Sequence, residues 1–516
     1  MSEYNESASL MREKLNNISP TFCAAKWLQV SLHLPQGRTQ SCYHPPTHVI
    51  PIELLKKNPS VLHNTPQKIE ERKMMIAGKR PAGCSYCWKM EDAPGGGENG
   101  HLSDRHYRSS EWWSAPLVDT IAENGAEWDV APTYVEVNFN QACNFKCMYC
   151  SPHLSTTWEE EIKKHGEYKL GKGYRHNDIS ALDQIGLMPL HVSNKENPYV
   201  TAFWEWWPLI YPGLRVFRMT GGEPLMDANT YKILDYVNDN PHGALELAVT
   251  SNFCPPTQNL FDKFIESVKK LEKVRMFYDD TNFNEISQNN WYIQSAFKHF
   301  MVFVSCDGYG KQAEYMRNGM NFDVLVGNVN TFLKETRCTS ISFINTFNVL
   351  SIPSLKDFLQ MILNLRKIHA YAGDYTLYPE PDMNGTIHGP FVHKNFQRIL
   401  FDIPLLRYPN WFMVQNSGQA GINKVKEAIK FMEDNNETND EVFTGFKEYE
   451  ILKLKRNLAV MEEGISINEL RQNKGNFYRF IEQHDERRNT NFLQTFPELK
   501  LFYIECKNEA KNETSR

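Results

Sequence analysis

The amino-acid sequence predicts an α/β protein with a partial (β/α)6 TIM-like barrel, an N-terminal small Cys-rich module and a helical C-terminal extension. Three observations lead to this fold class. From residue 133 to about 380, short apolar runs alternate with amphipathic segments, the pattern of parallel strands joined by helical crossovers. Several cysteines precede this region. Beyond residue 385 the sequence is rich in charged residues and has the periodicity of helices. The predicted domains are therefore 1–128, 129–385 and 386–516.

Six segments have the length and composition of strands. The first, 133–140, alternates polar with apolar residues, and amphipathic stretches such as 258–274 and 322–336 are predicted as helices between strands. Six strand–helix units indicate a partial barrel rather than the full eight. The other five predicted strands are 215–219, 244–249, 300–306, 341–349 and 374–379.

Length and composition limit the class of protein. With 516 residues, 41% hydrophobic and 23% charged, the chain has the make-up of a globular protein of two or three domains. A net charge of −6 gives no strong nucleic-acid signal, because non-specific binding to phosphates needs many exposed Lys and Arg. The amino terminus has no secretory pattern, and no apolar run has the length of a membrane span. We therefore expect a cytoplasmic protein with no membrane partner.

Three cysteines lie within eight residues, directly after the first predicted strand. Cys143, Cys147 and Cys150 have the spacing Cys-x3-Cys-x2-Cys, and thiolates this close select iron-sulfur clusters or zinc over harder ions. Three thiolates leave one ligand position open, where chemistry can occur. Structural zinc needs a fourth ligand, which His153 can supply, so spacing alone leaves both metals open. The loop follows a strand, and ligands of α/β proteins bind at such strand ends.

A glycine pair follows the second predicted strand, in the segment MTGGEPLMD. Gly221 and Gly222 allow the backbone to turn tightly and to approach a ligand closely, with Glu223 beside them. The other interpretation is a turn before a helix, with Pro224 at the first helical position. The segment alone does not decide between them.

With these two motifs in this order, the chain resembles the radical S-adenosylmethionine (radical SAM) enzymes. In that family three cysteines bind three irons of a [4Fe-4S] cluster, and the amino and carboxylate groups of S-adenosylmethionine chelate the fourth. The resemblance implies that Cys143, Cys147 and Cys150 are metal ligands. It also implies the cofactor-binding residues, which are Tyr149 at the adenine, Gly221, Gly222 and Glu223 at the methionine amino group, Asn252 nearby, Ser305 and Asp307 at the ribose, and Arg317 at the carboxylate.

The resemblance implies an enzyme whose cofactor supplies the difficult chemistry. The reduced cluster would cleave S-adenosylmethionine to a 5'-deoxyadenosyl radical, which abstracts hydrogen from an unknown substrate (peptide, nucleoside or small molecule). An electron donor such as flavodoxin or ferredoxin is implied as a partner, and no catalytic residue of the chain itself is identified. Two other classes stay open, a non-catalytic iron-sulfur redox sensor or scaffold and a zinc-stabilised binding module.

Four more cysteines, Cys23, Cys42, Cys84 and Cys87, precede the predicted barrel. One Cys-x2-Cys pair with two distant cysteines is typical of a zinc ribbon, with His44 as an alternative ligand. A strand pair with a glycine turn lies between the first two cysteines, and the segment resembles the SPASM/twitch module of radical SAM enzymes. The resemblance implies an auxiliary iron-sulfur cluster on all four thiolates. That module normally follows the barrel, whereas here it precedes it.

Two remaining segments give only structural expectations. The Trp-rich stretch FWEWWPLI is expected to be buried core rather than a substrate wall. The extension contains no motif of recognisable chemistry. Four of its residues are polar enough for a substrate contact, but we expect helix surface. They are Asp485, Arg487, Arg488 and Glu498.

Overall fold

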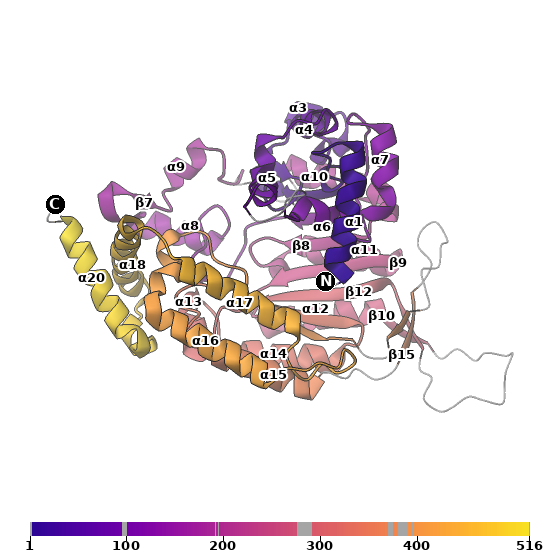
Figure 1. The fold of residues 1–516 in the computed structure, drawn as a ribbon. Helices are drawn as coiled ribbons and strands as arrows, with labels where there is room; N and C mark the ends of the chain where they lie inside the picture. Colours follow the sequence, from indigo (N-terminus) through magenta and orange to yellow (C-terminus); the bar gives the residue numbers. More distant parts are fainter. Residues whose placement is uncertain are drawn as a thin grey trace, which may run out of the picture.

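The computed structural model describes residues 3–94, 101–190, 192–193, 196–275, 292–369, 375–379, 391–393 and 396–514. A nine-stranded mixed sheet lies at its centre (Figure 1) and consists of β1 (Gln29–His33), β2 (Arg38–Gln40), β3 (His48–Val49), β4 (Tyr134–Asn138), β8 (Val216–Thr220), β9 (His242–Ser251), β12 (Phe297–Ser305), β14 (Thr339–Ile344) and β17 (Ile399–Asp402). The strand order is β17-β14-β12-β9-β8-β4-β1-β2-β3. The predicted α/β class is therefore confirmed, and closure into a barrel stays a prediction.

Strands β4, β8, β9, β12 and β14 pair in parallel in chain order, as the alternating pattern predicts. Helices join them because each intervening segment has one apolar face to bury against the sheet. The main crossovers are α10 (Pro198–Ile210), α11 (Ala228–Asp239), α12 (Gln258–Leu271), α14 (Phe322–Glu335) and α15 (Leu355–His369). The Trp-rich segment is α10, and its Phe203 and Trp207 are fully buried in the main core, as expected.

The prediction of the sixth strand of this series was wrong. Residues predicted at 374–379 form β15 (Tyr375–Pro379), which belongs to a separate sheet of order β10-β11-β15-β16, with β10 (Glu272–Arg275), β11 (Tyr292–Ser295) and β16 (Phe391–His393). The sixth parallel strand is β17, paired with β14 from Ile341↔Ile399 to Ile344↔Asp402. Both runs have strand composition, and long-range pairing rather than intrinsic preference decides which one joins the main sheet.

The amino-terminal segment extends the other edge of the sheet. β1 runs parallel to β4, from Gln29↔Tyr134 to His33↔Asn138, and β2 and β3 follow antiparallel. The turn between β1 and β2 contains Gly37 at φ +61°, a conformation that favours glycine. Figure 1 shows the surrounding helices together above the sheet, among them α1 (Glu3–Ile18), α4 (Pro66–Ile76), α5 (Ser85–Glu91), α6 (Asp104–Ser110) and α7 (Val118–Asn124).

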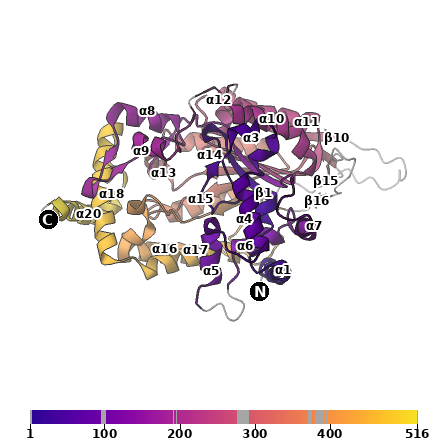
Figure 2. The ribbon, with the colours of Figure 1, turned by 90° about the horizontal axis from the view of Figure 1, so that it is seen from above.

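The two faces of the parallel strands differ in character. On one face the register partners Val137, Met219 and Val249 are fully buried and belong to the main core. On the other face the register partners Glu136 and Arg218 are half-buried. Figure 2 shows α10, α11 and α12 along one side of the molecule and α1, α5 and α6 along the opposite side. The apolar face thus packs under the crossover helices.

The extension is mostly helical, with α16 (Gly418–Asp434), α17 (Glu448–Glu463), α18 (Ile467–Arg488) and α20 (Lys500–Thr514). α18 packs against α20 and against the hairpin of β6 (Tyr168–Lys169) and β7 (Arg175–His176) in the long first crossover. In both views α18 lies on the same side of the molecule as α8 (Thr156–His165) (Figures 1 and 2). Across the described ranges, no helix combines the length and the apolar character needed to cross a membrane.

Candidate functional site

The loop that carries Cys143, Cys147 and Cys150 leaves the carboxyl end of β4 and leads into α8, as the sequence predicts. Its middle, β5 (Lys146–Cys147), pairs antiparallel with β13 (Arg317–Asn318). The indole nitrogen of Trp158, at the start of α8, donates to the Cys147 carbonyl oxygen at 2.8 Å. The loop is therefore held by backbone pairing on one side and by a helix on the other.

The three thiols are free and half-buried. Burial, with a smaller contribution from the Cys147 thiol, raises the pKa of Cys143 to about 12. Burial also raises the pKa of Cys150, and the Cys147 and Cys143 thiols add to this rise. Three neighbouring thiols with raised pKa values stay protonated at neutral pH unless a cationic metal group displaces their protons. Arg317 already provides one positive group, since its Nη1 donates to Cys147 Sγ at 3.4 Å.

The glycine pair brings the end of β8 into close contact with this loop. Gly221 has φ +139°, and a Cβ there would lie 2.6 Å from Asn138 Oδ1. A Cβ on Gly222 would lie 2.2 Å from the Ala142 carbonyl oxygen, which accepts a hydrogen bond from the Glu223 N–H at 2.7 Å. Both glycines are thus required by packing alone, and their role at a methionine amino group stays a prediction.

The Glu223 carboxylate joins the ends of two strands. It is 1% exposed, and it accepts hydrogen bonds from the Leu225 N–H (3.0 Å), the Ser251 hydroxyl (2.7 Å) and the Asn252 N–H (2.7 Å). The Asn252 side chain in turn donates to Asn144 Oδ1 in the cysteine loop at 2.8 Å. Pro224 begins a short 3-10 helix, η7 (Pro224–Met226), so the turn interpretation of this segment also holds.

Asp307, Arg317 and Tyr149 form a buried network beside Cys147. Asp307 is fully buried, and its carboxylate is 2.8 Å from Arg317 Nε and accepts hydrogen bonds from the Tyr149 hydroxyl and the Thr346 N–H, both at 2.8 Å. Arg317 also donates to the Tyr149 hydroxyl. Arg317 is 6% exposed, so it belongs to this buried network and is not a surface charge. Their contacts with a cofactor stay predictions, as does that of Ser305, which is half-buried at the end of β12.

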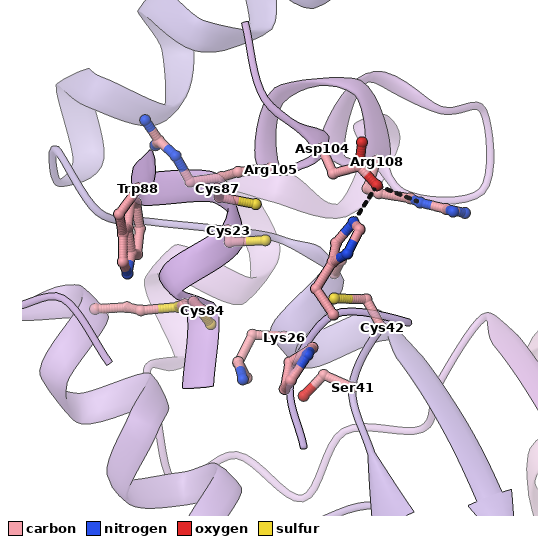
Figure 3. A pocket seen from close by; sticks show the side chains of 14 residues that line it. Cys23, Lys26, Ser41, Cys42, Cys84, Cys87, Trp88, Asp104, Arg105 and Arg108 are labelled. Atoms are coloured by element: carbon pink, nitrogen blue, oxygen red, sulfur yellow. Dashed lines mark hydrogen bonds and ion pairs between the residues drawn. The ribbon is translucent and has the colours of Figure 1, made fainter. Parts of the chain in front are cut away.

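Cys23, Cys42, Cys84 and Cys87 line one cavity of about 20 Å³ in the amino-terminal module (Figure 3). The structure thus brings together four residues that span a distance of 64 positions in the sequence. Burial raises the pKa of Cys23, and the Cys87, Cys42 and Cys84 thiols each add to the rise, as expected for mutual neighbours. Within the described ranges no three His, Cys, Asp or Glu side chains are grouped as ligands of a single metal ion.

The alternative histidine ligands have other partners. His44 Nε2 lies 2.7 Å from Asp104 Oδ2, and its ring stacks on Tyr86 with a centroid separation of 3.7 Å. His153 Nδ1 lies 2.8 Å from the Ser151 hydroxyl, and burial lowers the pKa of this histidine to about 4. His44 also lines the four-thiol cavity, so it stays an alternative ligand there through its second ring nitrogen.

Cationic side chains surround the four-thiol cavity. Lys26, Arg105 and Arg108 line it, and Lys26 is 2% exposed with its Nζ 2.5 Å from Glu71 Oε2. Burial opposes the charge on Lys26, but the Cys84 thiol and Glu71 raise its pKa above the usual value. Four thiolates around a cluster carry net negative charge, and buried charge needs a counter-charge. The donor set and the nearby charges therefore fit an anionic iron-sulfur cluster in chemistry, whereas the cavity of about 20 Å³ has room for about one water.

The ion pair between Arg218 and Glu136 was not predicted from the sequence. On the less buried face of the sheet, Arg218 Nε lies 3.4 Å from Glu136 Oε2, and its guanidinium lies 3.9 Å from the Phe303 ring centroid. Tyr43 of the amino-terminal module donates to the same carboxylate at 3.1 Å. Glu136 and Arg218 are polar residues within two predicted strands. They could have indicated this pair, because parallel register places them side by side.

The expectation of helix surface was wrong for part of the extension. The Arg488 side chain is fully buried between α18 and α8, whereas Glu498 is exposed near Gln312. Asp485 accepts a hydrogen bond from the Tyr315 hydroxyl at 2.7 Å, and Arg487 donates to the Gly166 carbonyl oxygen at 2.9 Å. A charged helix of weak periodicity gave no indication that one polar edge faces inward.

No protein-family model matches the chain, and no curated protein matches its sequence. Among solved structures, it is similar to Streptococcus suis SuiB in the crystal structure bound to the precursor peptide SuiA. The identity is 10% and the TM-score 0.25, over 66% of this chain and 60% of that one. The match thus spans less than two thirds of SuiB, and a likeness this weak carries no inference about activity.

Gly222→Ala is expected to destabilise the protein by about 2 kcal/mol, because the new methyl group overlaps the Ala142 carbonyl. Denaturant unfolding measures this change. Gly327→Ala is the matched control, because a Cβ there meets nothing within 4 Å and the residue lies inside α14. Equal stability of the two variants would contradict the packing role of Gly222.

Stability should fall as the pH rises from about 4.5 to about 7, through the titration of Glu223. Burial raises the pKa of this carboxyl to about 7, although three hydrogen bonds to it act in the opposite direction. A raised folded-state pKa stabilises the protein below the unfolded pKa, and this contribution, on the order of 3 kcal/mol, is lost as the group ionises. Unfolding curves at several pH values should show a smaller slope for Glu223→Gln than for the wild type. An unchanged slope would contradict the assignment.

Proposed function

We propose that this chain is a radical S-adenosylmethionine enzyme, with a [4Fe-4S] cluster on Cys143, Cys147 and Cys150 and an auxiliary iron-sulfur cluster on Cys23, Cys42, Cys84 and Cys87. The observation that carries the proposal is the three-thiol loop at the carboxyl end of β4, in contact with the glycine-rich end of β8. Three thiolates at a strand end leave one iron open for a small-molecule ligand. When bound there, the cluster and S-adenosylmethionine would supply the electron and the 5'-deoxyadenosyl radical.

The chain's own residues would orient these groups and exclude water. Arg317 would keep Cys147 in place through its contact with the sulfur, and Asp307 would hold Arg317. We further propose that 1–128, 129–385 and 386–516 act as auxiliary-cluster module, catalytic core and extension. The substrate would approach the half-buried sheet face that carries Glu136 and Arg218, since the opposite face is filled by helices. An external electron donor such as flavodoxin or ferredoxin is part of this proposal.

A second candidate is a non-catalytic iron-sulfur protein, either a redox sensor or a scaffold. One observation favours it. Glu223, Asp307 and Arg317, which the family resemblance places around the cofactor, are buried and bind neighbouring residues of the chain itself. In a sensor these contacts would be the whole role of the three side chains. In an enzyme the same side chains would also contact the cofactor bound at the open iron.

Anaerobic reconstitution separates these candidates. The enzyme should take up about eight irons per chain, four for each cubane cluster, and should cleave S-adenosylmethionine to 5'-deoxyadenosine after reduction. Cys147→Ala should abolish this cleavage, whereas Cys84→Ala should leave part of it, because the two sites are separate. Zinc in both sites, or intact cofactor after full reduction of the clusters, would overturn the proposal. Equal loss in both variants with a folded core would mean that the second site is not auxiliary.

Lys26→Met should lower the midpoint potential of the auxiliary cluster by about 50–100 mV, because a buried positive charge favours the reduced, more negative cluster. An anaerobic redox titration followed by EPR measures the shift. Lys73→Met is the matched control, since Lys73 is an exposed lysine of α4 paired with Glu127. A potential that does not move in Lys26→Met would place the cluster elsewhere.

A further inference from the structure

Helix α18 of the extension ends beside the cysteine loop, although the two are far apart in the sequence. We propose that Arg488 is a positioning residue, which fixes the backbone of the cysteine loop at Lys146 and Cys147 and so makes the extension part of the three-thiol site. The metal-binding purpose of that loop rests on the proposed function. The positioning role of Arg488 rests only on its contacts.

The Arg488 guanidinium is bound on three sides. Its Nη1 donates to the Lys146 carbonyl oxygen at 2.7 Å, and its Nε and Nη2 donate to the two carboxylate oxygens of Glu161 at 3.1 and 3.3 Å. The side chain is fully buried, and that of Glu161 is 3% exposed. The two hydrogen bonds to the Glu161 carboxylate fix the orientation of the planar Arg488 guanidinium. The remaining donor, Nη1, is therefore held in position to bind the Lys146 carbonyl oxygen.

A second route leads from the same guanidinium to Cys147. Arg488 lies 4.9 Å from the ring centroid of Trp158, whose indole nitrogen donates to the Cys147 carbonyl oxygen at 2.8 Å. The carbonyl groups on both sides of the Cys147 Cα are thus constrained, one by Arg488 directly and the other through Trp158. A shift of this arginine would therefore move the cysteine backbone.

The partner strand of the cysteine loop is attached to the same helix. Asp485, one turn before Arg488, accepts a hydrogen bond from the Tyr315 hydroxyl at 2.7 Å. Tyr315 stands two residues before Arg317, which is opposite Cys147 in the β5–β13 pair and contacts its sulfur. One end of α18 thus holds both strands of the short ladder that contains the middle cysteine.

The charges in this contact are balanced. Burial opposes ionisation of Glu161, but Arg488 and hydrogen bonds from Tyr168, Arg488 and Lys146 lower the pKa of this carboxyl to about 2. Lys146 Nζ lies 3.0 Å from the same carboxylate. Loss of Arg488 leaves Lys146 as a partner for Glu161, so the variant need not bury an unpaired carboxylate.

The rest of α18 is docked without Arg488. Arg487 donates to the Gly166 and Glu167 carbonyl oxygens at 2.9 and 3.2 Å. Gln483 both accepts from the Lys169 N–H at 2.9 Å and donates to the Lys169 carbonyl oxygen at 2.8 Å. Removal of the Arg488 guanidinium should therefore loosen the cysteine loop locally, without detaching the helix.

The test compares the reactivity of individual thiols in the full-length apoprotein. In Arg488→Met, iodoacetamide should alkylate Cys147 about tenfold faster than in the wild type, by peptide mapping, because easier local opening of the loop outweighs the rise in the pKa of Cys147 that follows loss of the arginine charge. Cys87, in the amino-terminal module, and Cys338, directly before β14, should react at unchanged rates. Arg471→Met, a half-exposed arginine of the same helix near Glu509, should match the wild type. Arg488→Lys, which keeps the charge without the fork, should lie between them.

An unchanged Cys147 rate in Arg488→Met overturns the proposal, and so does equal acceleration of all thiols, which indicates general unfolding. If Arg488→Met does not fold, Glu161→Gln replaces it, because it releases the fork while Arg488 remains. The alkylation experiment needs no iron, so it tests the role of Arg488 even if the proposed function is wrong. In reconstituted protein, a changed EPR signal of the three-cysteine cluster in Arg488→Met, absent in Arg471→Met, supports the positioning role, and identical signals contradict it.

Discussion

The close contact between the cysteine loop and the end of β8 is the constraint on which the candidate site depends. Gly222 and Glu223 donate backbone hydrogen bonds to the Asn140 and Ala142 carbonyl oxygens, at 3.2 and 2.7 Å. Side chains at the two glycine positions would prevent this approach. The carboxylate of Glu223 then continues the connection to β9. Three strand ends and the loop are thus joined by hydrogen bonds, and the contacts of the loop itself, with Arg317, Trp158 and Arg488, add to this placement of the thiols.

The two thiol groups differ in the number of cations beside them. Arg317 contacts a sulfur atom of the three-thiol loop and is paired with Asp307. Three cationic side chains line the four-thiol cavity, and each is also paired with a carboxylate: Lys26 with Glu71, Arg105 with Glu91 and Arg108 with Asp104. Both proposed clusters would thus lie beside cations whose charge is balanced by a neighbouring carboxylate.

Local sequence patterns predicted those elements that form from residues close together in the sequence. The strands at the centre of the sheet, the loop position of the three cysteines and the turn at Pro224 follow from periodicity and from glycine and proline chemistry. β17 did not, because a four-residue run has no periodicity of its own and is selected by pairing with β14. The Asp307–Arg317 pair and the inward turn of Arg488 depend on side-chain direction in three dimensions. The contact from Arg488 to Lys146 joins residues 342 positions apart, beyond the reach of any local signal.

Binding of S-adenosylmethionine to the open iron can be measured by electron-nuclear double resonance on the reduced, reconstituted protein, with the cofactor labelled at its amino nitrogen. Chelation of the open iron predicts a hyperfine coupling from the labelled nitrogen, lost when the unlabelled cofactor is used. A fully reduced three-cysteine cluster that shows no coupling at saturating cofactor would contradict the account, since its fourth iron would then not be the seat of S-adenosylmethionine.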